Sequence, residues 1–278
     1  MTDLAALFPD GAEGRALELG LPAGRLVRPF APTYTDFGLP PVERPAYWLS
    51  DAPASADLWQ RLRAAHSASG LWPLLLVPGN FRNPGAPWTV GDVIPESAAE
   101  IDRCDPAEFM RAEWDEWAAE EEGEEDIGYD FEDLEPFGRT CPGLAAPGTS
   151  GHAPDDVADW CAGRFDDGTA RMGLVAAARS ADTLAIMGWQ GPVNHHQPSP
   201  LSAMLRSWED RFGVRVVRVG FDTLDVSVAA PPVTEEHALH VAAEHFAFCP
   251  DNVQQGPGTL REYAKDIQGA NTWSFWWD

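Results

Sequence analysis

Two alternating runs near the carboxy terminus constrain the fold more than any other feature. VRVVRVGF at 214–221 and DTLDVSVAAPP at 222–232 alternate apolar and polar residues, and a short turn joins them. A period of two on both sides of a turn is typical of an antiparallel β-hairpin. Pro231 and Pro232 end the second run. The sequence therefore predicts a hairpin here.

The segments that flank the hairpin predict helices and a last strand. LSAMLRSWEDRFG at 201–213 carries an apolar stripe at helical spacing, and Gly213 can stop this helix. Thr234 can cap a second helix, whose first turn holds two glutamates. NTWSFWWD at 271–278 reads as a strand with large aromatic residues on both faces. The apolar stripes of these elements predict one core that contains Leu205, Trp208, Val217, Val226, Leu239 and Phe246.

The amino-terminal part predicts a second unit of mixed structure. PAYWLS at 45–50 reads as a strand, SADLWQRLRAAHSASG at 55–70 as a helix, and LWPLLLVPG at 71–79 as another strand. This order suggests a βαβ-like unit. Pro73 favours an edge position for the last strand, or a strand that begins after it. The fold class predicted is α+β, with an N-terminal α/β unit and a C-terminal α+β domain.

The middle of the chain differs from both ends. Between Glu113 and Glu135, 13 of 23 residues are acidic and none is basic, and aromatic residues lie among them. CPGLAAPGTSGHAP at 141–154 is rich in Gly and Pro and reads as a linker. We expect an N-terminal region at 1–104, a connecting segment at 105–168 and a C-terminal domain at 169–278. Residues from about 120 to 151 are expected to be mobile or loosely packed.

Several strings resemble a known family. GWQGPVN, LRSWEDRFG, GFDTLDVSVAAPP, EHFAFCPDNVQQGPGTL and WSFWWD resemble the uncharacterised actinobacterial family named domain of unknown function 4253. YWLS, LWQRL and GLWPLLL resemble the N-terminal part of its long members more loosely. The resemblance implies no activity and assigns no catalytic residue.

Charge and cysteine content bound the function. The net charge of −25 comes from 19 basic and 44 acidic residues. A field of this sign disfavours nucleic acids and anionic membranes, and a basic protein is its natural complement. The first residues lack the apolar core of a signal peptide, and four cysteines without a C-x-x-C pair predict no zinc knuckle. We therefore expect a cytoplasmic protein with reduced thiols; no cofactor is predicted, and the oligomeric state stays open.

EHFAFCPDNVQQG at 244–256 is the best-placed candidate for chemistry. His245, Cys249 and Asp251 could form a thiolate nucleophile or a metal corner, with Asn194 and His196 from the loop at 188–200 as further members. The alternative is a helix end with a small buried thiol and an aspartate that caps the next turn. His237, His240 and Glu244 share one helix face and could meet a metal, but a solvated face explains them as well.

The sequence thus predicts a macromolecule-binding protein with a basic partner, for example an immunity-like protein that neutralises a basic toxin or nuclease. The alternative is an enzyme, a hydrolase or a modifying enzyme, that uses the His/Cys/Asp residues. The residues expected to contact a partner are Trp114, Trp117, Glu120, Glu121, Glu122 and Trp276.

Overall fold

The described residues form one seven-stranded mixed sheet with helices on both faces. The computed structural model describes residues 2–36, 38–40, 42–79, 87–120, 134–149 and 151–278. The strands are β1 (Gly24–Val27), β2 (Tyr47–Pro53), β3 (Leu71–Leu76), β4 (Arg171–Ala176), β5 (Arg215–Val219), β6 (Thr223–Ser227) and β7 (Thr272–Trp276). The helices are η1 (Leu4–Leu7), α1 (Ala31–Asp36), α2 (Ala56–Ala64), α3 (His66–Ser69), α4 (Ala98–Ile101), α5 (Pro106–Glu120), α6 (Pro154–Arg164), η3 (Ser180–Asp182), α7 (Thr183–Met187), α8 (Pro198–Phe212), α9 (Glu235–Phe248), α10 (Asp251–Gln254) and α11 (Leu260–Ile267). The α+β class predicted from the sequence is confirmed.

The sheet joins the regions that the sequence analysis separates. The strand order is β1-β2-β4-β3-β5-β6-β7, so β4 from the C-terminal part lies between β2 and β3 from the N-terminal part. β4 is antiparallel to both neighbours. β2, α2 and β3 are therefore a split βαβ unit, in which another strand occupies the place between the two parallel strands.

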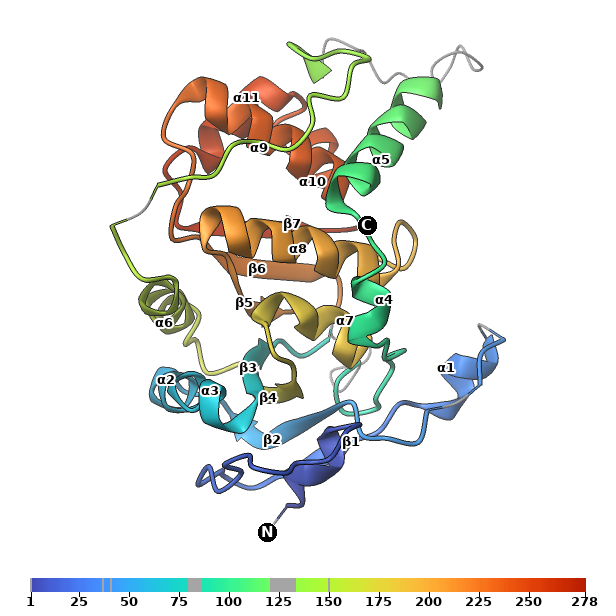
Figure 1. The fold of residues 1–278 in the computed structure, drawn as a ribbon, viewed down its shortest axis with the longest axis vertical. Helices are drawn as coiled ribbons and strands as arrows, with labels where there is room; N and C mark the ends of the chain where they lie inside the picture. The colour runs from blue at the N-terminus through green and yellow to red at the C-terminus, as the bar shows by residue number, and fades with distance from the viewer. Residues whose placement is uncertain (1, 37, 41, 80–86, 121–133, 150) are drawn as a thin grey trace.

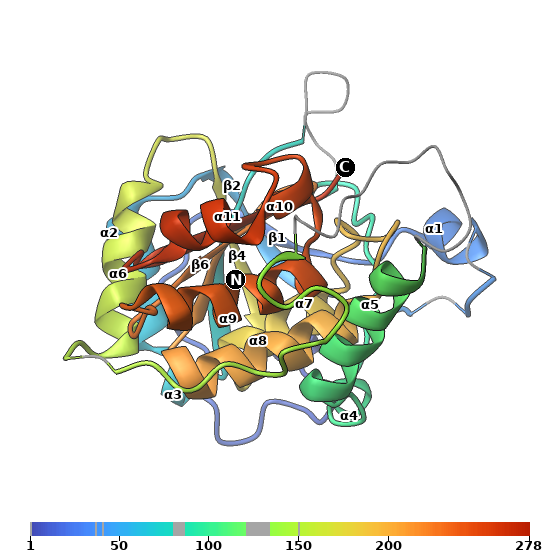
Figure 2. The same cartoon turned by 90° about the horizontal axis from the view of Figure 1, so that it is seen from above.

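Helices cover the two faces of the sheet. On one face, α2 packs on β3, and α6 packs on β5 and β6 (Figures 1 and 2). On the other face, α7 packs on β4, and the rings of α8 and α9 pack on β7. A further layer lies outside α9, where α11 and α5 both pack against it (Figure 1).

Pro73 lies in a central strand, contrary to the edge position that it favours. Pro73 pairs with Leu174 of β4, whereas the pairing of β3 with β5 begins only at Leu75. On the β5 side, Trp72 Nε1 donates a hydrogen bond to Val216 O at 2.9 Å. Beside Pro73 the two strands are not yet paired, so the missing N–H costs no ladder hydrogen bond.

The expected signals for element ends hold in the structure. Ser55 and Thr234 accept hydrogen bonds from Leu58 N and His237 N, both at 3.2 Å. Gly213 adopts a φ of 63° at the end of α8, a conformation that a side chain would strain. β5 and β6 form the predicted antiparallel hairpin, and β7 is added to its other side.

The core centres on Trp208. Its indole stacks on Phe275 of β7 with ring centroids 5.5 Å apart and packs against Phe248 of α9 at 4.8 Å. Aromatic pairs at these distances add to the free energy gained from burial alone. All six residues expected in the core are buried: Leu205, Trp208, Val217, Val226, Leu239 and Phe246.

A buried carboxylate joins α8, α9 and the connecting segment. Glu244 of α9 is fully buried and forms a two-point ion pair with Arg211 of α8, at 2.7 and 2.6 Å. Trp208 Nε1 donates to the same carboxylate at 2.7 Å, and Ala145 N donates at 2.6 Å. Arg211 also donates to Ala145 O at 2.9 Å. Both carboxylate oxygens are thus satisfied by donors from two parts of the chain, α8 and the connecting segment.

Within the described residues, the connecting segment contains helices and makes close contacts with the rest of the protein. It contains α5 and α6, and residues around Ala145 run across α8 and α9. Gly148 lies so close to Ala230 that an added Cβ would be 2.0 Å from the carbonyl oxygen of Ala230. The Gly and Pro content permits this close approach. Residues 121–133, within the stretch expected to be mobile, lie outside the described residues.

We predict that Glu244→Gln lowers the free energy of unfolding by about 3–5 kcal/mol, because it leaves Arg211 desolvated without its anion. Glu262→Gln is the matched control. Glu262 pairs with Lys265 on the surface, where such pairs contribute about 0–1 kcal/mol. Urea unfolding of the two variants measures the difference, and equal losses would contradict the role given to Glu244.

Candidate functional site

The corner between α9 and α10 clamps the edge of the sheet. β7 is an edge strand, and an exposed edge invites pairing with other chains. Asn252 Nδ2 donates to Ser274 O at 2.7 Å, and Asn252 Oδ1 accepts from Trp276 N at 3.0 Å. Cys249 Sγ donates to Trp276 O at 2.9 Å, and Asp251 Oδ2 accepts from Asp278 N at 3.0 Å. The motif that suggested chemistry therefore takes the place of a neighbouring strand.

His245 lies beneath this clamp in an aromatic shell. It is fully buried, with ring centroids at 4.5 Å from Trp273, 4.9 Å from Phe275 and 4.9 Å from Trp208. Its Nδ1 is 3.0 Å from the hydroxyl of Tyr263. Burial lowers the pKa of His245 to about 3, and the nearby Arg211 acts in the same direction. His245 is therefore a neutral core residue near pH 7.

The Cys249 thiol is poorly suited to nucleophilic chemistry. It is fully buried, and burial raises its pKa well above the ordinary value. A thiol attacks as the thiolate, which is stabilised by cations or by a helix amino terminus. Cys249 bonds to the β7 backbone and His245 bonds to Tyr263, so these two residues do not pair as a nucleophile and its base. This geometry does not favour the catalytic roles considered for both.

The loop at 188–197 does approach Asp251, but through a neighbour of the expected histidine. His195 Nε2 lies 3.6 Å from Asp251 Oδ2, whereas His196 points elsewhere. Asn194 is exposed in the same loop. The sequence pointed to Asn194 and His196 because loops after strands often carry binding residues. Adjacent histidines diverge, and the sequence alone cannot tell which of them faces α10.

His196 instead meets a carboxylate of α5. His196 Nδ1 is 3.7 Å from Glu113 Oε1, and the imidazole packs edge-on against Phe109 at 5.2 Å. Burial raises the pKa of Glu113 to about 7 and lowers that of His196 to about 4. Between these values neither side chain is charged, so the contact buries no uncompensated ion. The sequence analysis did not identify Glu113 as a candidate site residue. Phe109, an aromatic residue one helical turn earlier, was the sequence signal that could have pointed to it.

This region contains two histidine–carboxylate contacts that differ in their exposure to solvent. The Asp251–His195 contact is partly exposed, and a carboxylate in this position can orient an imidazole as a general base. The Glu113–His196 contact is buried and holds α5 against the loop. The Cys249 thiol is bonded to the strand, so it is not placed as a nucleophile for these histidines.

The helix face that carries His237, His240 and Glu244 is only partly covered: Glu244 is buried, whereas His237 and His240 are partly exposed. His237 Nε2 lies 2.8 Å from Ala146 O, and His240 Nδ1 lies 2.9 Å from Glu236 O. Glu244 is taken by Arg211. His237 and His240 line a pocket of about 360 Å³ together with residues 142–146, an arrangement that the helical spacing could not reveal. Within the described ranges, no three His, Cys, Asp or Glu side chains are placed to hold a metal ion.

The aromatic residues expected to contact a partner mostly face inward. Trp114, expected as a partner contact, is fully buried, packs on Phe246 at 5.7 Å and donates to Gly138 O at 3.1 Å. Trp117 is half-buried and also packs on Phe246. Trp276 is 38% exposed. The structure describes no side chain for Glu120, and Glu121 and Glu122 lie outside the described residues.

The comparison with protein families gives one match. Residues 171–278 match the family described as Domain of unknown function (DUF4253). The resemblance carried by the C-terminal strings is thereby confirmed; the match does not bear on actinobacterial origin. It begins at β4 and leaves out the looser N-terminal resemblance. Neither the curated proteins nor the solved structures yield a match to the chain.

We predict that Asn252→Asp lowers the free energy of unfolding by about 1–3 kcal/mol, because the carboxylate cannot donate to Ser274 O and leaves that bond unmade. Gln254→Glu is the matched control, since it also replaces an amide by a carboxylate within α10. Urea unfolding of both variants measures the effect. Losses of similar size would show that added charge in α10, and not the clamp, is responsible.

We predict that the free energy of unfolding of the His245→Phe variant rises relative to that of the parent protein as the pH falls. With a pKa of about 3 in the folded protein and about 6.5 when unfolded, His245 binds more protons in the unfolded chain between these values. Stability is therefore lost as the pH falls below 6.5. Between pH 7 and pH 5 the variant should gain roughly 2 kcal/mol relative to the parent protein. Unfolding at both pH values tests this, and parallel profiles would contradict it.

Proposed function

We propose that this protein binds a basic macromolecule through the acidic outer side of α5 and the acidic residues that follow it. The observation that carries the proposal is that acidic side chains on the surface of α5 have no basic partner among the described residues. Glu108, Asp115 and Glu116 of α5 are exposed, and no described basic side chain pairs with them. Together with a net charge of −25, this leaves a surface that attracts cations.

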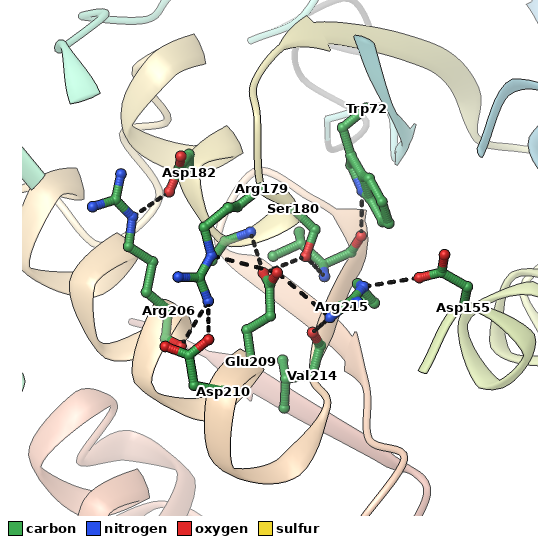
Figure 3. Close-up of polar contacts among 12 residues, drawn as sticks. Trp72, Asp155, Arg179, Ser180, Asp182, Arg206, Glu209, Asp210, Val214 and Arg215 are labelled. Carbon is green, nitrogen blue, oxygen red and sulfur yellow. Dashed lines mark hydrogen bonds and ion pairs between the residues drawn. The ribbon is translucent and has the colours of Figure 1, made fainter. Parts of the chain in front are cut away.

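Several arginines pair with carboxylates within the fold. Figure 3 shows Arg179 and Arg215 converging on Glu209, each at 3.5 Å, while Ser180 donates to the same carboxylate at 3.1 Å. Arg206 likewise pairs with Asp182. The described arginines that pair with carboxylates include Arg15, Arg25, Arg63, Arg179, Arg206, Arg211, Arg215 and Arg218.

The aromatic residues of α5 support the proposal by anchoring the helix, whereas the sequence predicted that two of them contact the partner. Phe109 packs on His196, and Trp114 and Trp117 pack on Phe246. These contacts fix the helix on the body of the protein. A fixed helix presents its carboxylates in a constant arrangement, which lowers the entropy cost of binding.

An immunity-like role, in which the protein neutralises a basic toxin or nuclease in the cytoplasm, is the specific form of this proposal. Charge steering would raise the association rate of such a pair. The alternative, an enzyme that acts through His245, Cys249 and Asp251, has less support because these side chains fill the core or clamp β7. No described helix has both the length and the apolar character needed to cross a membrane.

We predict that binding weakens with salt, because the Debye length falls from ~10 Å at 0.1 M to ~3 Å at 1 M. Capture from native lysate at both salt concentrations, followed by identification of the retained proteins, should yield basic partners that are lost at high salt. With an isolated partner, the triple change Glu108→Gln, Asp115→Asn and Glu116→Gln should slow association.

The matched control neutralises Glu13, Glu18 and Asp57, which are exposed in the N-terminal region and change the net charge equally. A change of similar size in both variants would assign the effect to total charge rather than to α5. Glu120→Gln, Glu121→Gln and Glu122→Gln together should also slow association. A partner bound equally well at both salt concentrations would overturn the proposal.

A further inference from the structure

A pocket of about 420 Å³ lies where the N-terminal region meets the part that matches the family. Its apolar lining comes from Phe8, from Ala176–Ala178 at the end of β4 and from Ile186 of α7. Pockets of this size accept small molecules, and those molecules are usually oriented by a few polar groups. The charged side chains of the lining are therefore informative.

One wall of the pocket carries arginines from the N-terminal region. Arg44 is partly buried and donates to Leu7 O at 3.0 Å, and the described part of the chain gives it no carboxylate partner. Burial lowers the pKa of Arg44, which reflects the cost of desolvating its charge. Arg15 lies over the ring of Phe8 at 4.2 Å and is 3.6 Å from Asp10. Arg44 is thus a desolvated cation whose only described partner is a neutral carbonyl.

A carboxylate without a cation also lines the pocket. Glu96 precedes α4 and accepts a hydrogen bond from Ser199, but among the described residues no basic side chain pairs with it. Burial raises its pKa, and Glu100 acts in the same direction. Asp182, the neighbouring acidic residue of the lining, is already paired with Arg206. Arg44 and Glu96 line one pocket without forming an ion pair with each other.

We propose that this pocket binds a small zwitterion, a free amino acid, with its carboxylate at Arg15 and Arg44, its ammonium group at Glu96 and its side chain on the apolar lining. A partly buried charge without a counterion is unfavourable, and one ligand that carries both charges compensates both walls. The inference is independent of the macromolecule-binding role, because the pocket residues are not those of α5.

Calorimetric titration of the full chain with free L-amino acids tests the proposal, with leucine as the first probe. N-acetyl-leucine lacks the ammonium group and leucinamide lacks the carboxylate. We expect both derivatives to bind at least about tenfold more weakly than leucine, since each leaves one charge of the pocket unpaired. Other amino acids in the panel report which side chain the apolar lining prefers.

Arg44→Met and Glu96→Gln should each weaken binding of the preferred amino acid by at least about tenfold. Arg25→Met is the matched control, because Arg25 pairs with Asp51 on the surface outside this pocket. The affinity of this variant for the amino acid should stay within about twofold of that of the parent protein. The ligand derivatives give a result even if a variant is poorly folded. The proposal is overturned if no amino acid binds at about 10 mM, if either derivative binds as tightly as the parent amino acid, or if both folded variants bind normally.

Discussion

The buried ion pair between Glu244 and Arg211 is the interaction on which the rest of the structure depends. A carboxylate inside a protein is tolerated only when its oxygens are fully bonded, and Glu244 receives donors from Arg211, Trp208 and Ala145. The pair sets α8 against α9 and draws the connecting segment across both helices. α5 packs on the same α9, so the acidic helix takes its position from a helix that this pair fixes.

The second constraint is the closure of the sheet edge. β7 carries Trp273 and Phe275 toward the core, Trp277 follows it into the core, and the free edge of β7 is bonded by side chains of the α9–α10 corner. Because a side-chain amide can donate and accept at once, Asn252 replaces two backbone partners. A polar motif in such a place satisfies a strand, and the same residues are then unavailable for catalysis.

The match to residues 171–278 gains meaning from the topology. β4 and β5 both belong to the matched segment, yet β3 from outside it lies between them. The strands of the matched part alone therefore do not form a continuous sheet. The pocket with Arg44 and Glu96 depends on the same union, since its walls come from both sides of the boundary.

The sequence by itself determined the local elements and the composition of the core. The hairpin at β5 and β6, the caps at Ser55 and Thr234 and the six buried core residues all follow from periodicity and capping, which are short-range properties. The acidic character also follows from composition alone.

Only the tertiary structure decided which polar residues meet. Helical spacing placed Glu244 beside His237 and His240, but it could not show that His237 meets Ala146 or that Arg211 lies opposite Glu244. It also could not show that β4 lies between β2 and β3, or that Cys249 and Asn252 bond to β7. These contacts join residues far apart in the chain, and their partners are fixed by how the sheet and helices pack, which no local pattern records.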